Sequence, residues 1–136
     1  MASRLNPYLS FKDNARAAME FYKTVFGGEL TVMTFAEGGM PVDAGEKDNV
    51  MHSQLVAPNA YWLMGSDTPA HMGAPSPNGS VSLSGDDDAL LRGYWEKLSA
   101  GGSITMPLAT APWGDSFGML VDKFGVPWLV NIAAQR

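Results

Sequence analysis

The amino-acid sequence predicts an α+β fold in which two tandem βαβββ units form curved mixed sheets around a cavity. The chain has 136 residues, which is the length of one domain with a substantial core. Its strand and helix patterns occur twice in the same order, about 73 or 74 residues apart. Each helical pattern is followed by a glycine pair and then by three strand patterns. We therefore expect one domain over residues 1–136, with repeat units at about 4–67 and 79–134.

In the first copy, residues 5–11 alternate apolar and polar side chains, which predicts a strand. Asp13 and Asn14 then offer an N-cap for a helix over residues 15–26. Gly27 is positioned to end that helix. The apolar stripe of the helix consists of Ala18, Phe21, Tyr22 and Val25. Further strands are expected at residues 30–35, 51–56 and 61–64, the last two flanking a turn at 57–60.

The second copy repeats this order. Residues 80–84 alternate in the same way, and the acidic run at 86–88 caps a second helix that ends at the glycine pair 101–102. The stripe of this helix is Leu91, Tyr94, Trp95 and Leu98. Strands are expected at residues 103–108, 117–121 and 127–132. The halves check one another, which strengthens each strand prediction.

Two looser segments remain, at residues 36–49 and at the Pro/Gly-rich linker 68–79. Neither has the apolar pattern to form a core by itself. We expect them to lie over a pocket or a subunit contact.

Charge and composition exclude several classes of partner. The formal net charge is -5, and the 9 Lys and Arg residues are scattered rather than clustered. Nucleic acids and anionic membranes bind basic surfaces, so neither is an expected partner. The chain has no cysteine, which removes disulfides, thiolate metal sites and cysteine nucleophiles. Residues 1–8 contain no apolar run of signal-peptide length, and we expect a cytoplasmic protein.

Characteristic sequence blocks run through nearly the whole chain. They are Pro7 to Phe11, Phe21 to Glu29, Met51 to Ser53, Leu63 to Asp67, Gly101-Gly102, Met106 to Leu108, Trp113-Gly114, Phe117-Gly118 and Asp122 to Trp128. With the paired βαβββ order, these blocks make the chain similar to the vicinal oxygen chelate superfamily, which contains glyoxalases, bleomycin-resistance proteins and extradiol dioxygenases. Within it, the chain most resembles the PhnB-like branch. The resemblance implies a glyoxalase/bleomycin-resistance-like fold with a cavity, and a homodimer.

In enzymes of that superfamily, His and Glu side chains in the cavity hold a divalent metal, which acts as a Lewis acid on the substrate. The corresponding positions here are Asn6, Ser80, Leu129 and a position near Leu63. None is a His or a carboxylate, and aliphatic side chains have no donor for a metal. We therefore expect no metal and no other cofactor.

His52 and His71 are the chain's two histidines. His52 and Gln54 lie two residues apart in a predicted strand and thus share a face. A metal would need further donors, so a histidine hydrogen-bonded in the cavity is the preferred interpretation of His52. His71, in the linker, is interpreted as a solvated loop residue.

The sequence provides little support for a nucleophilic serine, an acidic cation site or a nucleotide site. The hydroxyls of Ser80, Ser82 and Ser84 lack a base and a nucleophile elbow, and the acidic run 86–88 is explained by helix capping. No glycine-rich nucleotide motif is present. The methyltransferase label sometimes attached to this branch is therefore not the expected function.

Aromatic residues give a better indication of function. Trp113 lies in a Pro-Trp-Gly turn, where core packing explains it less well than it explains the other aromatics. Methionines such as Met51 and Met64 suit an adaptable apolar wall. The expected ligand-binding residues are Asn6, Tyr8, His52, Gln54, Trp62, Ser80, Ser82, Trp113, Phe117, Trp128 and Asn131.

The preferred hypothesis is a metal-free protein that binds a small organic molecule. One alternative is a metal-dependent lyase, isomerase or dioxygenase with a displaced site at His52, Gln54 and an acid from residues 43–48. Another is a homodimer that acts only through interaction. Sequence reasoning leaves open the ligand, and whether the units pair within one chain or between two.

Overall fold

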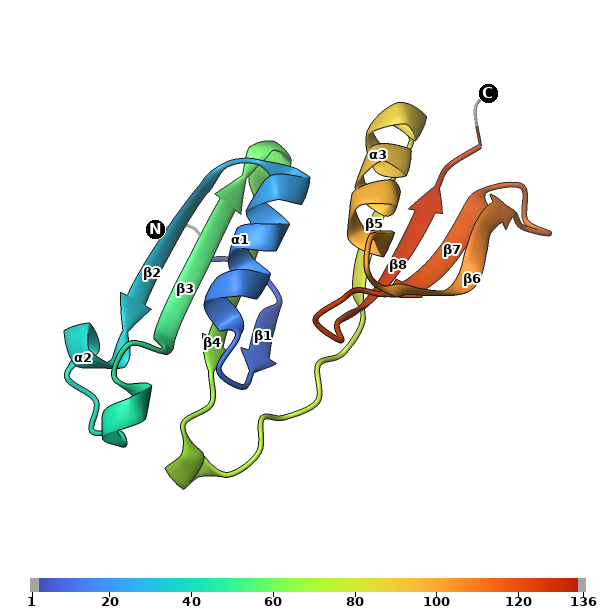
Figure 1. Ribbon diagram of the computed structural model, residues 1–136. Coiled ribbons are helices and arrows are strands. Elements are labelled where there is room, and N and C mark those ends of the chain that lie inside the picture. Colours follow the sequence, from blue (N-terminus) through green and yellow to red (C-terminus); the bar gives the residue numbers. More distant parts are fainter. Residues whose placement is uncertain (1–2, 135–136) are drawn as a thin grey trace. The chain divides into compact units, whose positions relative to one another are not determined.

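The computed structural model describes residues 3–134 and divides into two compact units, Met1–Pro77 and Asn78–Arg136 (Figure 1). The boundary between Pro77 and Asn78 falls within the Pro/Gly-rich linker that the sequence predicts. No helix in the described residues is long and apolar enough to cross a membrane.

Unit 1 is a four-stranded mixed sheet with one long helix. The strand order is β1-β4-β3-β2, with β1 parallel to β4 and the other neighbours antiparallel. The strands are β1 (Tyr8–Phe11), β2 (Glu29–Thr34), β3 (Val50–Ala57) and β4 (Tyr61–Asp67), and the helices are α1 (Ala15–Phe26) and the short α2 (Phe35–Gly38). Single 3-10 turns lie at Ala44–Glu46, Pro58–Ala60 and Ala70–Met72.

Unit 2 repeats the topology. Its strand order is β5-β8-β7-β6, again with a parallel pair, β5 and β8, at one edge. The strands are β5 (Val81–Gly85), β6 (Ser103–Thr110), β7 (Ser116–Val121) and β8 (Pro127–Ile132), and the helix is α3 (Asp88–Ser99). The prediction of two βαβββ units with mixed sheets is confirmed.

Helix α1 packs its apolar stripe on the sheet of unit 1 (Figure 1). Ala18, Tyr22 and Val25 are buried there, as their helical spacing predicts. The predicted N-cap needs a correction, because Asn14 occupies the cap position without a side-chain hydrogen bond. Asp67, from the end of β4, accepts the N–H of Ala15 at 2.9 Å instead. A distant carboxylate therefore satisfies a backbone donor at the helix start.

The second glycine of each pair makes a close approach to a neighbouring strand. A Cβ atom on Gly28 would overlap the carbonyl oxygen of Val56, and one on Gly102 would overlap that of Val121. Glycine is required at both places because the backbones leave no room for a side chain. The repeat thus shares a packing constraint as well as a pattern.

One loose segment is more ordered than predicted. Phe35 is not the end of a strand but the first residue of α2, whose N-cap is Thr34. Thr34 and Glu37 form a capping box, in which each side chain bonds the other residue's backbone N–H. This short helix places the buried Phe35 at the end of the sheet.

Candidate functional site

The candidate site lies on the face of the unit 1 sheet that is turned away from α1. A Cβ on Gly65 would lie 3.2 Å from the Met19 sulfur, so Gly65 faces α1. Its neighbours Met64 and Ser66 therefore point to the opposite face, because strand side chains alternate. We call this opposite face the site face. The strand registers place on it Tyr8, Ser10, Met33, His52, Gln54, Val56, Trp62, Met64 and Ser66.

Tyr8 and His52 form a pair on the site face. The Tyr8 hydroxyl oxygen lies 3.1 Å from Nδ1 of His52, and the two rings are stacked with centroids 5.8 Å apart. If the imidazole proton is on Nε2, Tyr8 donates to Nδ1 and the Nε2–H can donate to a bound molecule. The pair comes from β1 and β3, which are separated in the sheet by β4.

Gln54 and Trp62 join this pair on the same face. Gln54 is directly opposite Met64, and Trp62 is directly opposite Val56. The Arg4 guanidinium carbon lies 3.7 Å from the centroid of a Trp62 ring, a cation–π contact. Asn6 precedes β1 and donates from its amide to the carbonyl of Pro7 at 3.1 Å. Four predicted site residues, Tyr8, His52, Gln54 and Trp62, are thus brought together on one surface.

In unit 2, most of the predicted site residues lie on the sheet face opposite α3 or at exposed positions beside it. Ser82, Phe117 and Asn131 lie on the sheet face opposite α3, and Ser80 is exposed just before β5. Asn131 donates from Nδ2 to Asp115 at 3.0 Å, which ties β8 to the loop between β6 and β7. The side chain of Trp113, 61% exposed, meets Phe117 edge to face at 5.7 Å. Both line a mainly apolar pocket of about 300 Å³ with Met106 and Pro107, among others.

Trp128 requires a correction. It pairs with Val81 on the face that packs against α3, is 1% exposed, and donates its indole N–H to Asp122 at 2.8 Å. It is a core residue of unit 2, and the expectation that it contacts a ligand does not fit this position. Side chains alternate between the two faces of a strand, so Trp128 faces α3, whereas Leu129 and Asn131 lie on the opposite face of β8.

One of the four positions compared with metal ligands also needs a correction, because the position expected near Leu63 is occupied by Met64. Leu129 is opposite Met119 and pairs with Ser82, and the equivalent place in unit 1, next to Tyr8 and Gln54, belongs to Met64. Leu63 instead faces α1 and is buried. The four positions are therefore Asn6, Met64, Ser80 and Leu129, and their side chains do not fit a divalent metal of the kind held by His and Glu. Within residues 3–134, no group of three or more His, Asp and Glu side chains is arranged to hold a metal.

A pocket of about 360 Å³ lies in unit 1, at the edge of the site face. Its lining comes from β1, the start of β3, the end of β4, α2 and both loose segments. The residues are Ser10, Phe35, Met40, Met51, Ser66, Asp67, Thr68, Pro69, Met72, Ala74 and Ser76. The sequence predicts that the segments 36–49 and 68–79 lie over a pocket or a subunit contact, and it indicates Met51 as part of an apolar wall. The full set of lining residues has no signal in the sequence, because residues so far apart are joined only by the fold.

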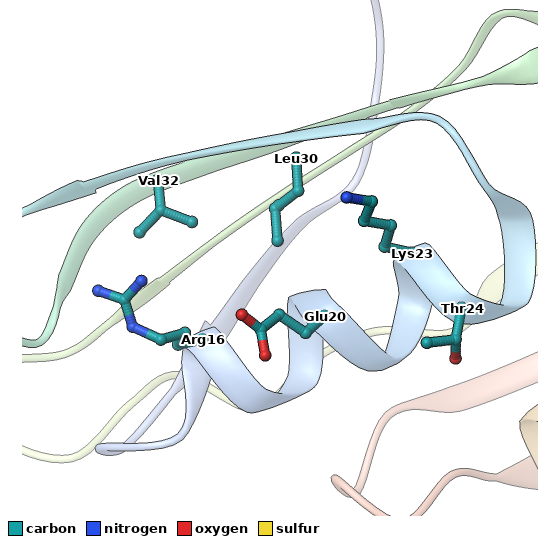
Figure 2. Close-up of a pocket in the computed structure, with 6 residues that line it drawn as sticks. All are labelled: Arg16, Glu20, Lys23, Thr24, Leu30 and Val32. Atoms are coloured by element: carbon teal, nitrogen blue, oxygen red, sulfur yellow. The ribbon is translucent and has the colours of Figure 1, made fainter.

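A second hollow in unit 1, about 640 Å³ and more open, lies on the helix side of the sheet. Figure 2 shows Arg16, Glu20 and Lys23 extending from α1 toward Leu30 and Val32 of β2. This groove is separated from the site face by the sheet itself. It has none of the predicted site residues.

Comparison with known proteins identifies relatives along almost the full chain. A family model described as 3-demethylubiquinone-9 3-methyltransferase matches residues 3–131. Protein YjdN of Escherichia coli K12 is 32% identical over 145 residues, covering 97% of each chain. The solved structure of PA1353 from Pseudomonas aeruginosa is 36% identical, with a TM-score of 0.86 over 98% of this chain and 100% of that one.

Two further structures place the chain more broadly. A PhnB protein from Bacillus cereus, titled a putative 3-demethylubiquinone-9 3-methyltransferase, is 27% identical, with a TM-score of 0.74 over 96% of this chain and 100% of its own. A glyoxylase/bleomycin resistance protein/dioxygenase domain from Frankia, 14% identical with a TM-score of 0.66 over 98% of each chain, shows the shared fold. The resemblance drawn from the sequence blocks is confirmed. This chain belongs to the 3-demethylubiquinone-9 3-methyltransferase family, is PhnB-like, and has the fold of glyoxalase/bleomycin-resistance proteins.

Proposed function

We propose that this protein binds a small organic molecule on the site face of unit 1 without using a metal. One observation carries the proposal. Tyr8, His52, Gln54 and Trp62 share a surface next to a pocket of about 360 Å³. The positions that the resemblance to metal-dependent enzymes compares with metal ligands are occupied by Asn6, Met64, Ser80 and Leu129. Pockets of a few hundred Å³ with a few convergent polar groups are typical of ligand sites.

Each of the four side chains has a role in this proposal. His52 and Gln54 supply hydrogen bonds to polar atoms of the ligand, and Tyr8 fixes the orientation of the imidazole. Trp62 supplies a flat apolar surface whose ring is held by Arg4. The strands of the sheet keep these groups in place, which limits the entropy lost on binding.

The test is a thermal-shift screen of the full chain against a broad set of metabolites. A ligand that binds the folded protein raises the melting temperature, because it stabilises only that state. His52→Ala and Tyr8→Phe should reduce the shift given by a hit, whereas Asp88→Ala, on α3 of unit 2, should leave the shift unchanged. A compound that gives the same shift in all three variants would show that it does not bind at Tyr8 and His52, which would contradict the proposed site. The absence of any hit would favour a protein that acts only through interaction.

The same preparation tests the enzymatic alternatives. Stoichiometric Zn, Ni, Mn or Fe in protein purified without chelator would overturn the metal-free proposal and favour the displaced site near His52. S-adenosylmethionine belongs in the screen because the family's description names a methyltransferase. A shift with this compound would favour methyl transfer over simple binding. We also propose a homodimer, which the molar mass measured by light scattering would support or exclude.

A further inference from the structure

The residues that line the 360 Å³ pocket indicate which class of ligand group it would bind. Its inner wall is the sheet and α2, where Phe35 and Met51 are apolar and Ser10 and Ser66 carry hydroxyls. Its outer wall is the segment 68–76, which we call the strap. The strap residues that line the pocket are Thr68, Pro69, Met72, Ala74 and Ser76.

The charge of the pocket disfavours anions. Among residues 3–134, no Lys or Arg lines the pocket, and Asp67 is the one charged residue that does. Asp67 is 4% exposed, and its two carboxylate oxygens accept the N–H groups of Ala15 and Val50, each at 2.9 Å. These two hydrogen bonds satisfy the carboxylate oxygens, so Asp67 does not need a cationic group of the ligand as a partner. Its negative charge repels an anionic group of the ligand.

We propose that this pocket binds an uncharged group of the ligand that has both apolar and hydrogen-bonding parts, an inference that rests on the proposed function. The volume of about 360 Å³ suits one or two rings or a short branched chain. Met40, Met51 and Met72 adapt their unbranched side chains to the shape of the group. The serine hydroxyls offer hydrogen bonds that orient it.

Two matched fluorescent probes test this ligand class. N-phenyl-1-naphthylamine is uncharged, and 8-anilino-1-naphthalenesulfonate is the same ring system with a sulfonate. We expect the uncharged probe to bind at least about tenfold more tightly. Equal binding, or tighter binding of the sulfonate, would overturn the proposal.

A variant of Gly38 locates the probe. A Cβ on Gly38 would overlap the Met51 thioether, which is the flexible end of a side chain and can move. Gly38→Ala should therefore fold but reduce the space in the pocket and weaken the uncharged probe several-fold. Gly45→Ala is the control, because nothing lies within 4 Å of a Cβ there. Unchanged affinity in Gly38→Ala would exclude this pocket, whereas metal in the purified protein would overturn the proposed function and leave this result standing.

A different observation concerns how the pocket opens. Glu46, 9% exposed, accepts the Ala70 N–H with both carboxylate oxygens, at 3.3 and 3.0 Å. Lys12 lies 3.5 Å from the same carboxylate and donates to the carbonyl of Thr68 at 3.4 Å. The first half of the strap is thus fastened to two other segments of unit 1. Pro75, in the second half of the strap, has no N–H that could donate to another segment.

We infer that the strap is a gate over the pocket and that Glu46 is its latch. Breaking the latch exposes the Ala70 N–H and lets Met72 move away from the pocket. Thr68 at the start of the strap is also held, by the hydrogen bond from its N–H to the carbonyl of Phe11 at 2.8 Å, whereas residues 70–74 are exposed to solvent. Opening the exposed part of the strap therefore costs less than unfolding the unit.

Stopped-flow binding of N-phenyl-1-naphthylamine tests the gate. In a gated pocket the observed rate levels off with probe concentration at the opening rate. Glu46→Ala should raise that limit several-fold and speed hydrogen exchange of the Ala70 amide, and Glu46→Gln, which keeps one acceptor oxygen, should have a smaller effect. Asp88→Ala, which removes the Asp88–Arg92 ion pair at 3.0 Å in unit 2, is the control. Unchanged rates in both Glu46 variants, or an equal change in the control, would overturn the inference.

Discussion

Buried carboxylates organise both units at the level of single residues. In unit 1, Asp67 joins the start of α1 to the start of β3 through two backbone N–H groups. In unit 2, Asp122 accepts the N–H groups of Phe124 and Val126 and the indole N–H of Trp128. Each carboxylate is nearly inaccessible to solvent, so its bonds replace water that the fold has removed.

Asp67→Asn should therefore destabilise the protein. Asparagine offers one oxygen where the structure uses two, and its NH₂ group would face a backbone N–H. We expect a loss of about 1.5–3 kcal/mol in the free energy of unfolding, measured by urea denaturation. Asp48→Asn, at an exposed position, should stay within about 0.5 kcal/mol of the parent. Equal stability of the two variants would contradict the role given to Asp67.

Acid should loosen α2 through Glu37. The ionised carboxylate accepts the Thr34 N–H at 2.9 Å, and this bond, followed by that with the Thr34 side chain, lowers the pKa of Glu37 below its ordinary value. The folded state holds the ionised form, so the capping box contributes fully above the ordinary Glu pKa. The contribution is lost as the pH falls through the lowered pKa. An NMR titration of the Glu37 carboxyl carbon should show a midpoint below the ordinary value, and a midpoint at or above it would contradict the capping box.

Elements are joined in both units by the glycine pair after the long helix. The strand neighbours of Gly28 and Gly102 approach so closely that a side chain at either place would overlap a carbonyl oxygen. The chain can therefore pass from the end of the helix directly into the next strand of the sheet through a connection of only a few residues. Here the pattern of the sequence and the needs of the fold agree.

Gly102→Ala should destabilise unit 2, whereas Gly93→Ala should stabilise it. A methyl group at Gly102 has no space, and the resulting strain costs about 1–3 kcal/mol. Gly93 lies inside α3 with nothing within 4 Å of a Cβ, so alanine there favours the helix by about 0.5–1 kcal/mol. Thermal denaturation followed by circular dichroism gives both values. The same sign for the two changes would contradict the packing described for Gly102.

At the scale of the whole molecule, the proposed function needs no metal. Dialysis against a chelator should therefore leave the melting temperature and any ligand-induced shift unchanged. At the four positions that the superfamily resemblance compares with metal ligands, the side chains are Asn6, Met64, Ser80 and Leu129, and none is a His or a carboxylate. A fall of several degrees after chelation, reversed by one divalent metal, would contradict this expectation.

The sequence by itself determined the repeated βαβββ order, the span of α1 and the span of β8, because helix and strand periods and glycine stops are local properties. It also predicted that His52 and Gln54 share a face, because they lie two residues apart in one strand. Two of its errors were of one residue or of one face. Leu63 stood where Met64 belongs, and Trp128 proved to face α3, because strand parity reverses with every residue.

Tertiary structure alone decided which distant groups meet. Asp67 replaces the expected Asn14 cap because the end of β4 lies beside the start of α1. The methionine-lined pocket joins α2 and the linker to the sheet, and Glu46 reaches the strap across a long stretch of chain. Such contacts depend on the path of the backbone in space, which no local period encodes.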